Sequence, residues 1–152
     1  MSELLEKARS YEAKKIAATD KESKPLFHIS APAGWINDPN GFSVYNGKIH
    51  LFYQYYPYLR EWGPMHWGHS TTSDMIKWEQ LPCVLAPDEE YDKKGCFSGS
   101  AIEADGKHVL VYTGVTRIKL PDGSEQERQN QCIAFGDGLN SVSYTHLRAH
   151  ET

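Results

Sequence analysis

The strongest candidate for chemistry is Asp38, a carboxylate within the segment Trp-Ile-Asn-Asp-Pro-Asn-Gly at residues 35–41. Neighbouring Asn amides can hold an Asp carboxylate ionised through hydrogen bonds, and the Trp35 indole can support one face of a sugar ring. Because Asp38 precedes a proline, we expect its backbone to be extended and to start a strand. The alternative is that this segment is only a turn, because each residue of Asn-Asp-Pro-Asn-Gly favours turns.

Three other positions are weaker candidates. Gln54 ends an apolar stretch, Phe-Tyr-Gln-Tyr, and is either an amide that binds a hydroxyl group or a satisfied edge residue. Ser98 lies among small residues that allow close approach of a ligand, but it lacks the strand-to-helix turn of a serine hydrolase. His66 and His69 have no evident third ligand and would point to opposite faces of a strand, so we expect no metal site.

The elements that position these residues change in character near residue 24. Residues 2–18 predict an amphipathic helix, with Ser2 as its N-cap. From Leu26 onward the sequence indicates short strands separated by turns. Asn46-Gly47 and Asp105-Gly106, each between apolar runs, predict two β-hairpins.

Successive hairpins without intervening helices indicate an antiparallel all-β fold. A sandwich, a barrel and a propeller all agree with this pattern. The first strands of the two hairpins contain Phe42 and Phe97, a spacing within reach of the roughly 40–50-residue period of propeller blades.

Composition excludes several classes of partner. The chain has 152 residues and a formal net charge of −4, so it lacks the basic surface that a nucleic-acid partner requires. No apolar run reaches the roughly 18 residues that would predict a membrane span. Cys83, Cys96 and Cys132 are too widely spaced for a zinc motif, and we expect reduced thiols in the cytoplasm because no secretory signal is visible. The aromatic content of 12% fits a β core or a sugar-stacking surface.

Seven motifs follow one another in order: His28–Pro32, the segment 35–41, Phe52–Gln54, Trp67–His69 with Ser73–Met75 and Trp78, Phe97–Ala101, Tyr112–Gly114 and Gln129–Ala134. This series resembles glycoside hydrolase family 32, the β-fructofuranosidases, which include invertases, sucrose-6-phosphate hydrolases and fructan hydrolases. The resemblance covers residues 24–140, and the helix within residues 1–20 is similar to that of the bacterial cytosolic branch.

The resemblance implies a retaining hydrolase on a five-bladed β-propeller, of which this chain would hold the first two to three blades after one α-helix. Asp38 would be the nucleophile that forms a covalent fructosyl-enzyme, and a second carboxylic acid would protonate the leaving group. The implied ligand is sucrose, sucrose 6-phosphate or a fructan, with no cofactor. The implied fructosyl-binding residues are Trp35, Asn37, Gln54, Trp62, Phe97 and Ser98.

The sequence departs from the family pattern at two motifs. The family's Arg-Asp-Pro and Glu-Cys motifs carry the transition-state-stabilising Asp and the acid/base Glu, and neither occurs here. Arg117, Arg128 and Arg148 are not followed by Asp-Pro, and no cysteine is preceded by Glu. We therefore expect a truncated chain that is inactive alone. A non-catalytic sugar-binding propeller fragment and a fructan hydrolase are the alternatives.

Residues 141–152 form a last segment that resembles neither the helix nor the strands before it. Residues 143–152 show no strand alternation and follow a Gly-Asp-Gly turn. We expect this segment to be foreign to the natural gene.

Overall fold

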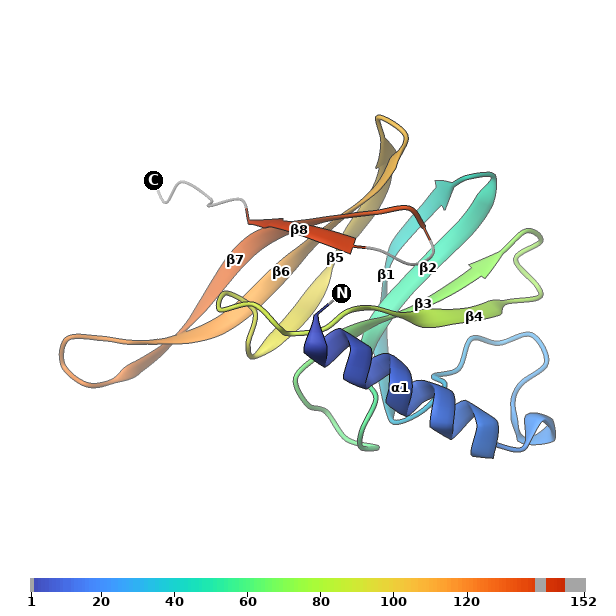
Figure 1. Cartoon of the computed structure of the whole chain (residues 1–152), viewed down its shortest axis with the longest axis horizontal. Helices are drawn as coiled ribbons and strands as arrows, with labels where there is room; N and C mark the ends of the chain where they lie inside the picture. The colour runs from blue at the N-terminus through green and yellow to red at the C-terminus, as the bar shows by residue number, and fades with distance from the viewer. Residues whose placement is uncertain (1, 139–141, 147–152) are drawn as a thin grey trace.

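The computed structural model describes residues 2–138 and 142–146 and places two β-sheets beside one long helix (Figure 1). The helix α1 spans Glu3–Ala18, and a short 3-10 helix η1 spans Lys21–Ser23. The strands are β1 (Trp35–Tyr45), β2 (Lys48–Tyr56), β3 (His66–Thr72), β4 (Glu79–Leu85), β5 (Gly95–Ala104), β6 (Lys107–Lys119), β7 (Glu125–Gly136) and β8 (Val142–His146).

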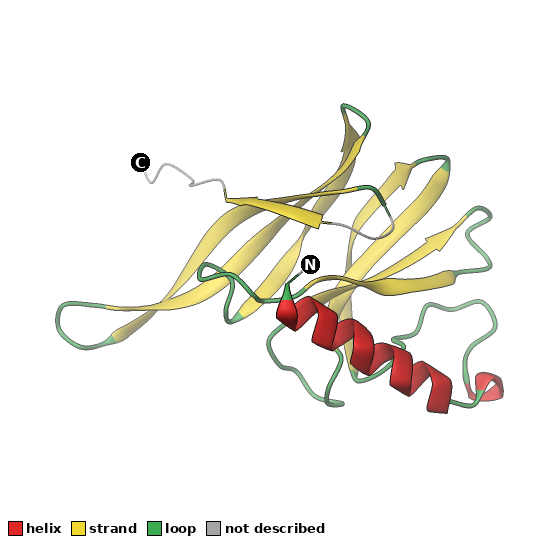
Figure 2. Cartoon of the chain, in the orientation of Figure 1, coloured by secondary structure: helices red, strands yellow, loops and turns green. Residues whose placement is uncertain are grey.

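Each sheet is a four-stranded antiparallel meander (Figure 2). The strand orders are β1-β2-β3-β4 and β5-β6-β7-β8, so chain neighbours are always sheet neighbours. Both predicted hairpins are confirmed. Their turns, Asn46-Gly47 and Asp105-Gly106, have positive φ at both positions, which is the backbone geometry that their residue types favour.

The two sheets meet through a shared apolar core. β1 and β5, the first strands of the two sheets, lie beside each other (Figure 1). Buried Trp67 from the first sheet packs with Tyr112 of the second. Hydrogen bonds also cross the junction: the Trp67 indole N–H donates to the Phe97 carbonyl (3.2 Å), and the Gln54 amide donates to the Cys96 carbonyl (2.9 Å). The prediction of an antiparallel all-β fold is thus confirmed.

The helix α1 packs on the first sheet and confirms the helix predicted at residues 2–18. Ser2 caps it by accepting a hydrogen bond from the Leu5 backbone N–H (3.2 Å). Leu5 and Ala8 are buried in a cluster with Tyr53 and Cys83. The Arg9 side chain fixes the helix further, because its Nε donates to the Cys83 carbonyl (2.8 Å).

Glu12 is the buried acid of this helix, and it makes the attachment of α1 dependent on pH. Its carboxylate accepts a hydrogen bond from the Cys83 backbone N–H (3.0 Å), and the side chain is 3% exposed. Burial raises the pKa of the Glu12 carboxyl from its ordinary 4.5 to about 7. The stability that its protonated form contributes is therefore complete below about pH 4.5 and lost as pH rises through about 7.

The substitution Glu12→Gln is expected to remove this dependence. Between about pH 5 and about pH 8 the wild type should lose about 3 kcal/mol of unfolding free energy that the variant retains. Urea unfolding at both pH values measures the loss, with the exposed Glu3→Gln of the same helix as the control. An equal wild-type-to-variant difference at both pH values would contradict the account.

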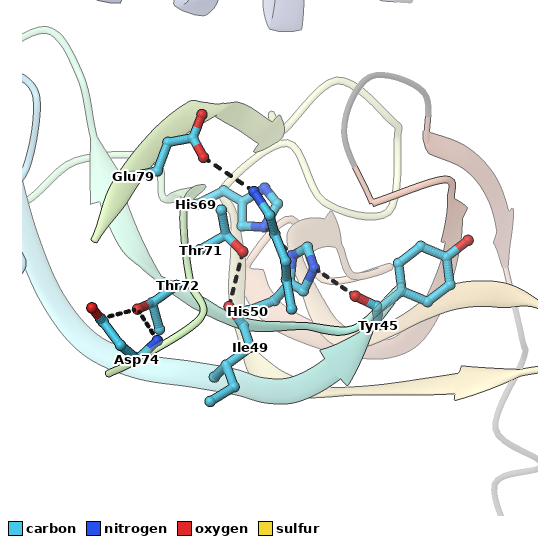
Figure 3. A network of polar contacts seen from close by, with 9 residues as sticks. Tyr45, Ile49, His50, His69, Thr71, Thr72, Asp74 and Glu79 are labelled. Carbon is cyan, nitrogen blue, oxygen red and sulfur yellow. Dashed lines mark hydrogen bonds and ion pairs between the residues drawn. The ribbon is translucent and has the colours of Figure 1, made fainter. Parts of the chain in front are cut away.

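Three buried histidines, His50 of β2, His69 of β3 and His108 of β6, lie together. His50 Nδ1 and His69 Nε2 are 2.9 Å apart, and the ring of His50 is 4.9 Å from that of His108. His50 also contacts the Tyr45 carbonyl through Nε2 (3.2 Å; Figure 3). His108 contacts the Ser43 hydroxyl (2.8 Å). The cluster therefore joins the first sheet to β6 of the second.

Acid is expected to weaken this junction. Burial lowers the pKa of His108 to about 4, so the stability contributed by its neutral form is present above about pH 6.5 and lost as pH falls through about 4. His108→Gln should therefore lose less unfolding free energy than the wild type between about pH 7 and about pH 4.5. Urea unfolding tests this, and the exposed His28→Gln should behave as the wild type. A His108→Gln variant with the wild-type pH dependence would refute the assignment.

The expectation that residues 143–152 contain no strand is wrong for part of the segment. Val142–His146 forms β8 and pairs antiparallel with Cys132–Gly136 of β7. The physical reason is that the edge of β7 offers unpaired backbone groups, and pairing with them does not require strand-like alternation of side chains. Residues 141 and 147–152 of the expected tail lie outside the described residues. A foreign origin of the tail stays a prediction.

Candidate functional site

Asp38 occupies a bulge in β1. Asn37 pairs with Gln54 and Pro39 pairs with Tyr53, so Asp38 is the extra residue between them. Its φ is +22°, and the prediction of an extended backbone at this position is therefore wrong. The restriction before proline is overridden because a bulge residue leaves the ladder, and Asp tolerates positive φ better than most residues do. Such a bulge turns the side chain away from the regular pleat.

The first strand of the second sheet repeats this feature at Ser98. Phe97 pairs with Thr113 and Gly99 pairs with Tyr112, which leaves Ser98 as the extra residue of β5. The Ser98 hydroxyl donates to Asp38 Oδ2 at 3.5 Å. Gly99 is required beside it, because a Cβ there would lie 1.9 Å from the Val111 carbonyl oxygen. Two bulges on neighbouring strands thus bring a hydroxyl to the carboxylate.

A pocket of about 330 Å³ opens around these two side chains. Its apolar corner consists of Trp62 and Phe97, whose rings meet edge to face with centroids 6.1 Å apart. Amides, hydroxyls and the carboxylate form the rest, a combination suited to a ligand with many hydroxyl groups. The lining residues are Asn37, Asp38, Gln54, Trp62, Phe97, Ser98, Thr113 and Gln129.

Gln54 both lines the pocket and supports it. The residue is 3% exposed, and its Nε2 donates to the Cys96 carbonyl across the two sheets. One of its amide hydrogens is therefore committed to structure, while its carbonyl oxygen can still accept a hydrogen bond. Gln54 can therefore be both a residue with satisfied hydrogen bonds and an amide that binds a hydroxyl group.

Trp35 is the one predicted binding residue that does not line this pocket. Its indole N–H donates to Asn37 Oδ1 at 2.7 Å. This bond fixes the orientation of the Asn37 amide, so that its NH₂ group is free to donate elsewhere. In this structure Trp35 positions a pocket residue, and its own contact with a ligand stays a prediction.

Sequence reasoning missed Thr113 and Gln129, which reach the pocket from β6 and β7. Thr113 lies opposite Phe97 in the ladder, and its hydroxyl accepts a hydrogen bond from Gln131 Nε2 (3.2 Å). Both residues fall within matched motifs, Tyr112–Gly114 and Gln129–Ala134. The signal was therefore present, but only the fold shows that β6 and β7 border the carboxylate.

Other reactive groups lie away from the pocket. The three cysteines are free and buried, and burial raises the pKa of the Cys96 thiol well above its ordinary range, so that it stays protonated. Within residues 2–138 and 142–146, no group of three or more His, Cys, Asp or Glu side chains could hold a metal ion. No helix in the described part of the chain has the length and apolarity that crossing a membrane requires.

Two antiparallel sheets whose first strands meet around a polar pocket define a part of a β-propeller with a site for a small polar ligand. The sequence matches the Glycosyl hydrolases family 32 N-terminal domain over residues 28–149. The chain belongs to glycoside hydrolase family 32.

Relatives with assigned names agree with this membership. The chain is 48% identical to a sucrose-6-phosphate hydrolase of Escherichia coli over 117 residues, which cover 76% of this chain and 24% of that protein. It is 48% identical to a levanase of Bacillus subtilis over 136 residues, 88% of this chain and 20% of that protein. The chain thus spans about a quarter or less of the length of these relatives.

Solved structures show the same architecture. A family 32 β-fructofuranosidase of Bombyx mori superimposes with a TM-score of 0.78 at 43% identity, covering 92% of this chain and 29% of that one. A sucrose-6-phosphate hydrolase of Lactobacillus gasseri gives a TM-score of 0.73 at 34% identity, covering 96% and 28%. These neighbours are five-bladed propellers, so the two sheets described above are two blades of that fold, in agreement with the predicted two to three.

Proposed function

We propose that this chain carries the nucleophile and the fructosyl pocket of a retaining hydrolase that cleaves the terminal β-D-fructofuranoside of sucrose or sucrose 6-phosphate. One observation carries the proposal. Of the seven residues that the family resemblance implies for the site, six line the single pocket around Asp38. They come from β1, β2, β5 and the loop between β2 and β3, so chance clustering of turn residues does not account for them.

The chemistry assigned to Asp38 is covalent. One oxygen of its carboxylate attacks the anomeric carbon of the fructosyl unit, an ester bond forms, and the glycosidic C–O bond breaks with its electron pair on the leaving oxygen. A carboxylate suits this step because the transition state resembles an oxocarbenium ion. Ser98 donates to Asp38 Oδ2, so it can hold the carboxylate in the orientation for attack.

The remaining lining residues bind the sugar. The NH₂ group of Asn37 and the carbonyl oxygen of Gln54 offer one donor and one acceptor to ring hydroxyl groups. Trp62 and Phe97 exclude water from the apolar face of the fructosyl ring. Thr113 and Gln129 lie on the side of the second blade and would contact the leaving group.

The leaving oxygen must also receive a proton, and the family's Glu-Cys motif is absent from these 152 residues. General acid–base catalysis contributes about 10²–10⁴-fold, so we expect these residues alone to leave sucrose essentially uncleaved.

The absence of the Glu-Cys motif also favours a second candidate function, a sugar-binding fragment without chemistry. Fructan as the substrate is a third candidate, and the relative named levanase is compatible with it. We place the protein in the cytoplasm.

A titration of the chain with fructose, followed by protein NMR, tests the binding site. We expect saturable shift changes that Trp62→Ala weakens by about tenfold, the effect of losing about 1.4 kcal/mol of contact energy. Phe42→Ala is the matched control, because Phe42 and Trp62 are similarly exposed (55% and 57%) and only Trp62 lines the pocket. No saturable change with the folded wild type, or equal weakening by Phe42→Ala, would overturn the proposal.

A further inference from the structure

A second cavity lies between the helix α1 and the loops that precede β1 and follow β2. Its volume is about 390 Å³, larger than that of the pocket around Asp38. Three cationic side chains line it: Lys15 of α1, Lys24 of the loop before β1, and Arg60 of the loop after β2. Among the described residues that line it, none is an Asp or a Glu.

The three cations are not neutralised by the protein. Among the described residues, no ion pair within 4.0 Å involves any of them. Lys24 is half-buried, and its ammonium group donates to the Ala31 carbonyl at 3.4 Å, which holds it in the cavity wall. Lys15 lies over the Tyr11 ring at 5.4 Å from its centroid. Glu22 and Asp20 are the acids nearest to Lys24 in sequence, and neither lines the cavity. The Asp20 carboxylate accepts a hydrogen bond from the Glu22 backbone N–H.

The cavity has a fixed wall. Tyr11 donates a hydrogen bond to the Tyr58 carbonyl (3.2 Å), and the two rings meet edge to face, which ties α1 to the loop after β2. Gly34 closes the other side with a φ of +62°, and a Cβ there would lie 2.1 Å from the Tyr56 carbonyl oxygen. The Tyr11–Tyr58 contacts therefore fix this wall of the cavity by interactions within the protein.

The cavity also lies at the Asp38 end of the first blade. Gly34 directly precedes Trp35, the first residue of β1, and Arg60 is in the same loop as Trp62, which lines the pocket around Asp38. Three residues of strand separate Gly34 from Asp38, so their Cα atoms are at most about 13 Å apart. A ligand with a charged group and a sugar is long enough to approach both places.

We infer that this cavity binds a phosphate monoester, held by Lys15, Lys24 and Arg60. Charge-assisted hydrogen bonds from ammonium and guanidinium groups are the usual means of holding phosphate, and a preformed site without carboxylates favours a dianion. The phosphate could belong to the substrate seated at Asp38 or to a separate molecule. Only the assignment of the phosphate to the substrate rests on the proposed function, because the anion site itself is inferred from the cavity alone.

Calorimetric titration of the full chain with inorganic phosphate and with glucose 6-phosphate tests the site. We expect both to bind saturably and glucose not to bind there. Lys24→Gln and Arg60→Gln should each weaken phosphate binding by about tenfold or more, since each removes a charge-assisted hydrogen bond. Lys107→Gln is the control, because Lys107 is a cationic side chain that lies outside the cavity, over the Phe135 ring (5.5 Å). Its affinity for phosphate should equal that of the wild type.

Asp38→Asn separates this inference from the proposed function. The variant should bind inorganic phosphate as the wild type does, whatever its effect on sugars. If sucrose 6-phosphate binds more tightly than either sucrose or phosphate, and Trp62→Ala removes that gain, the phosphate belongs to the substrate. If sucrose and phosphate bind independently, the ligand is a separate molecule. Absence of phosphate binding by folded wild-type chain, or equal weakening by Lys107→Gln, would overturn the site.

Discussion

Asp38→Asn is expected to abolish transfer of a fructosyl group to the protein. The measurement uses β-D-fructofuranosyl fluoride, because fluoride leaves without needing a proton, so the first step requires no general acid. The Asp38 carboxylate bonds to the anomeric carbon while the C–F bond breaks and fluoride departs with the electron pair. The wild type should release fluoride in a stoichiometric burst, and the Asn variant should show only the spontaneous rate.

The matched control for this experiment is Asp105→Asn. Asp105 and Asp38 both have positive φ (+51° and +22°), and Asn tolerates that backbone region as Asp does. The control therefore changes the same functional group in a similar backbone state, outside the pocket. A burst that survives in Asp38→Asn, or one that Asp105→Asn also removes, would exclude Asp38 as the nucleophile.

Trp67→Ala is expected to have the largest effect on stability, a loss of about 3–5 kcal/mol of unfolding free energy. The Trp67 side chain is fully buried between the two blades. It contacts the rings of Phe52 and Tyr112 and donates to the Phe97 carbonyl next to Ser98. Since small domains are stable by only about 5–15 kcal/mol, such a loss threatens the fold itself. Urea unfolding followed by far-UV circular dichroism measures it.

Trp62→Ala provides the comparison for Trp67→Ala. Trp62 is 57% exposed, so its removal should change the unfolding free energy by no more than about 0.5 kcal/mol while it weakens fructose binding. The two tryptophans thus separate support of the pocket from contact with the sugar. Equal destabilisation by both substitutions would contradict the assignment of Trp67 to the junction of the blades.

The local sequence is sufficient for most of the fold. Asn46-Gly47 and Asp105-Gly106 determine their hairpins because few other residue pairs adopt positive φ twice in succession. Ser2 and the apolar residues Leu5 and Ala8 likewise specify the start and the buried face of α1. β8 could not be predicted in this way, because its pairing depends on the free edge of β7 rather than on its own residues.

The site was predictable as a set of residues but not as a geometry. The motifs around Asp38, Gln54 and Ser98 identify their family, and the structure places all three in one pocket. The bulges that aim Asp38 and Ser98 at each other arise from the register of strand pairs, which no single strand encodes. For the same reason Thr113, on a strand of the second blade, could not be assigned to the site from sequence.

The most direct test of the central proposal is to locate the trapped fructosyl group. The wild-type chain is treated with β-D-fructofuranosyl fluoride, quenched in acid, digested and mapped by mass spectrometry. We predict a single fructosyl ester on Asp38 within the β1 segment, and none in the Asp38→Asn variant. A fructosyl group on another carboxylate, such as Glu103, or a folded wild-type chain that acquires none, would contradict the account.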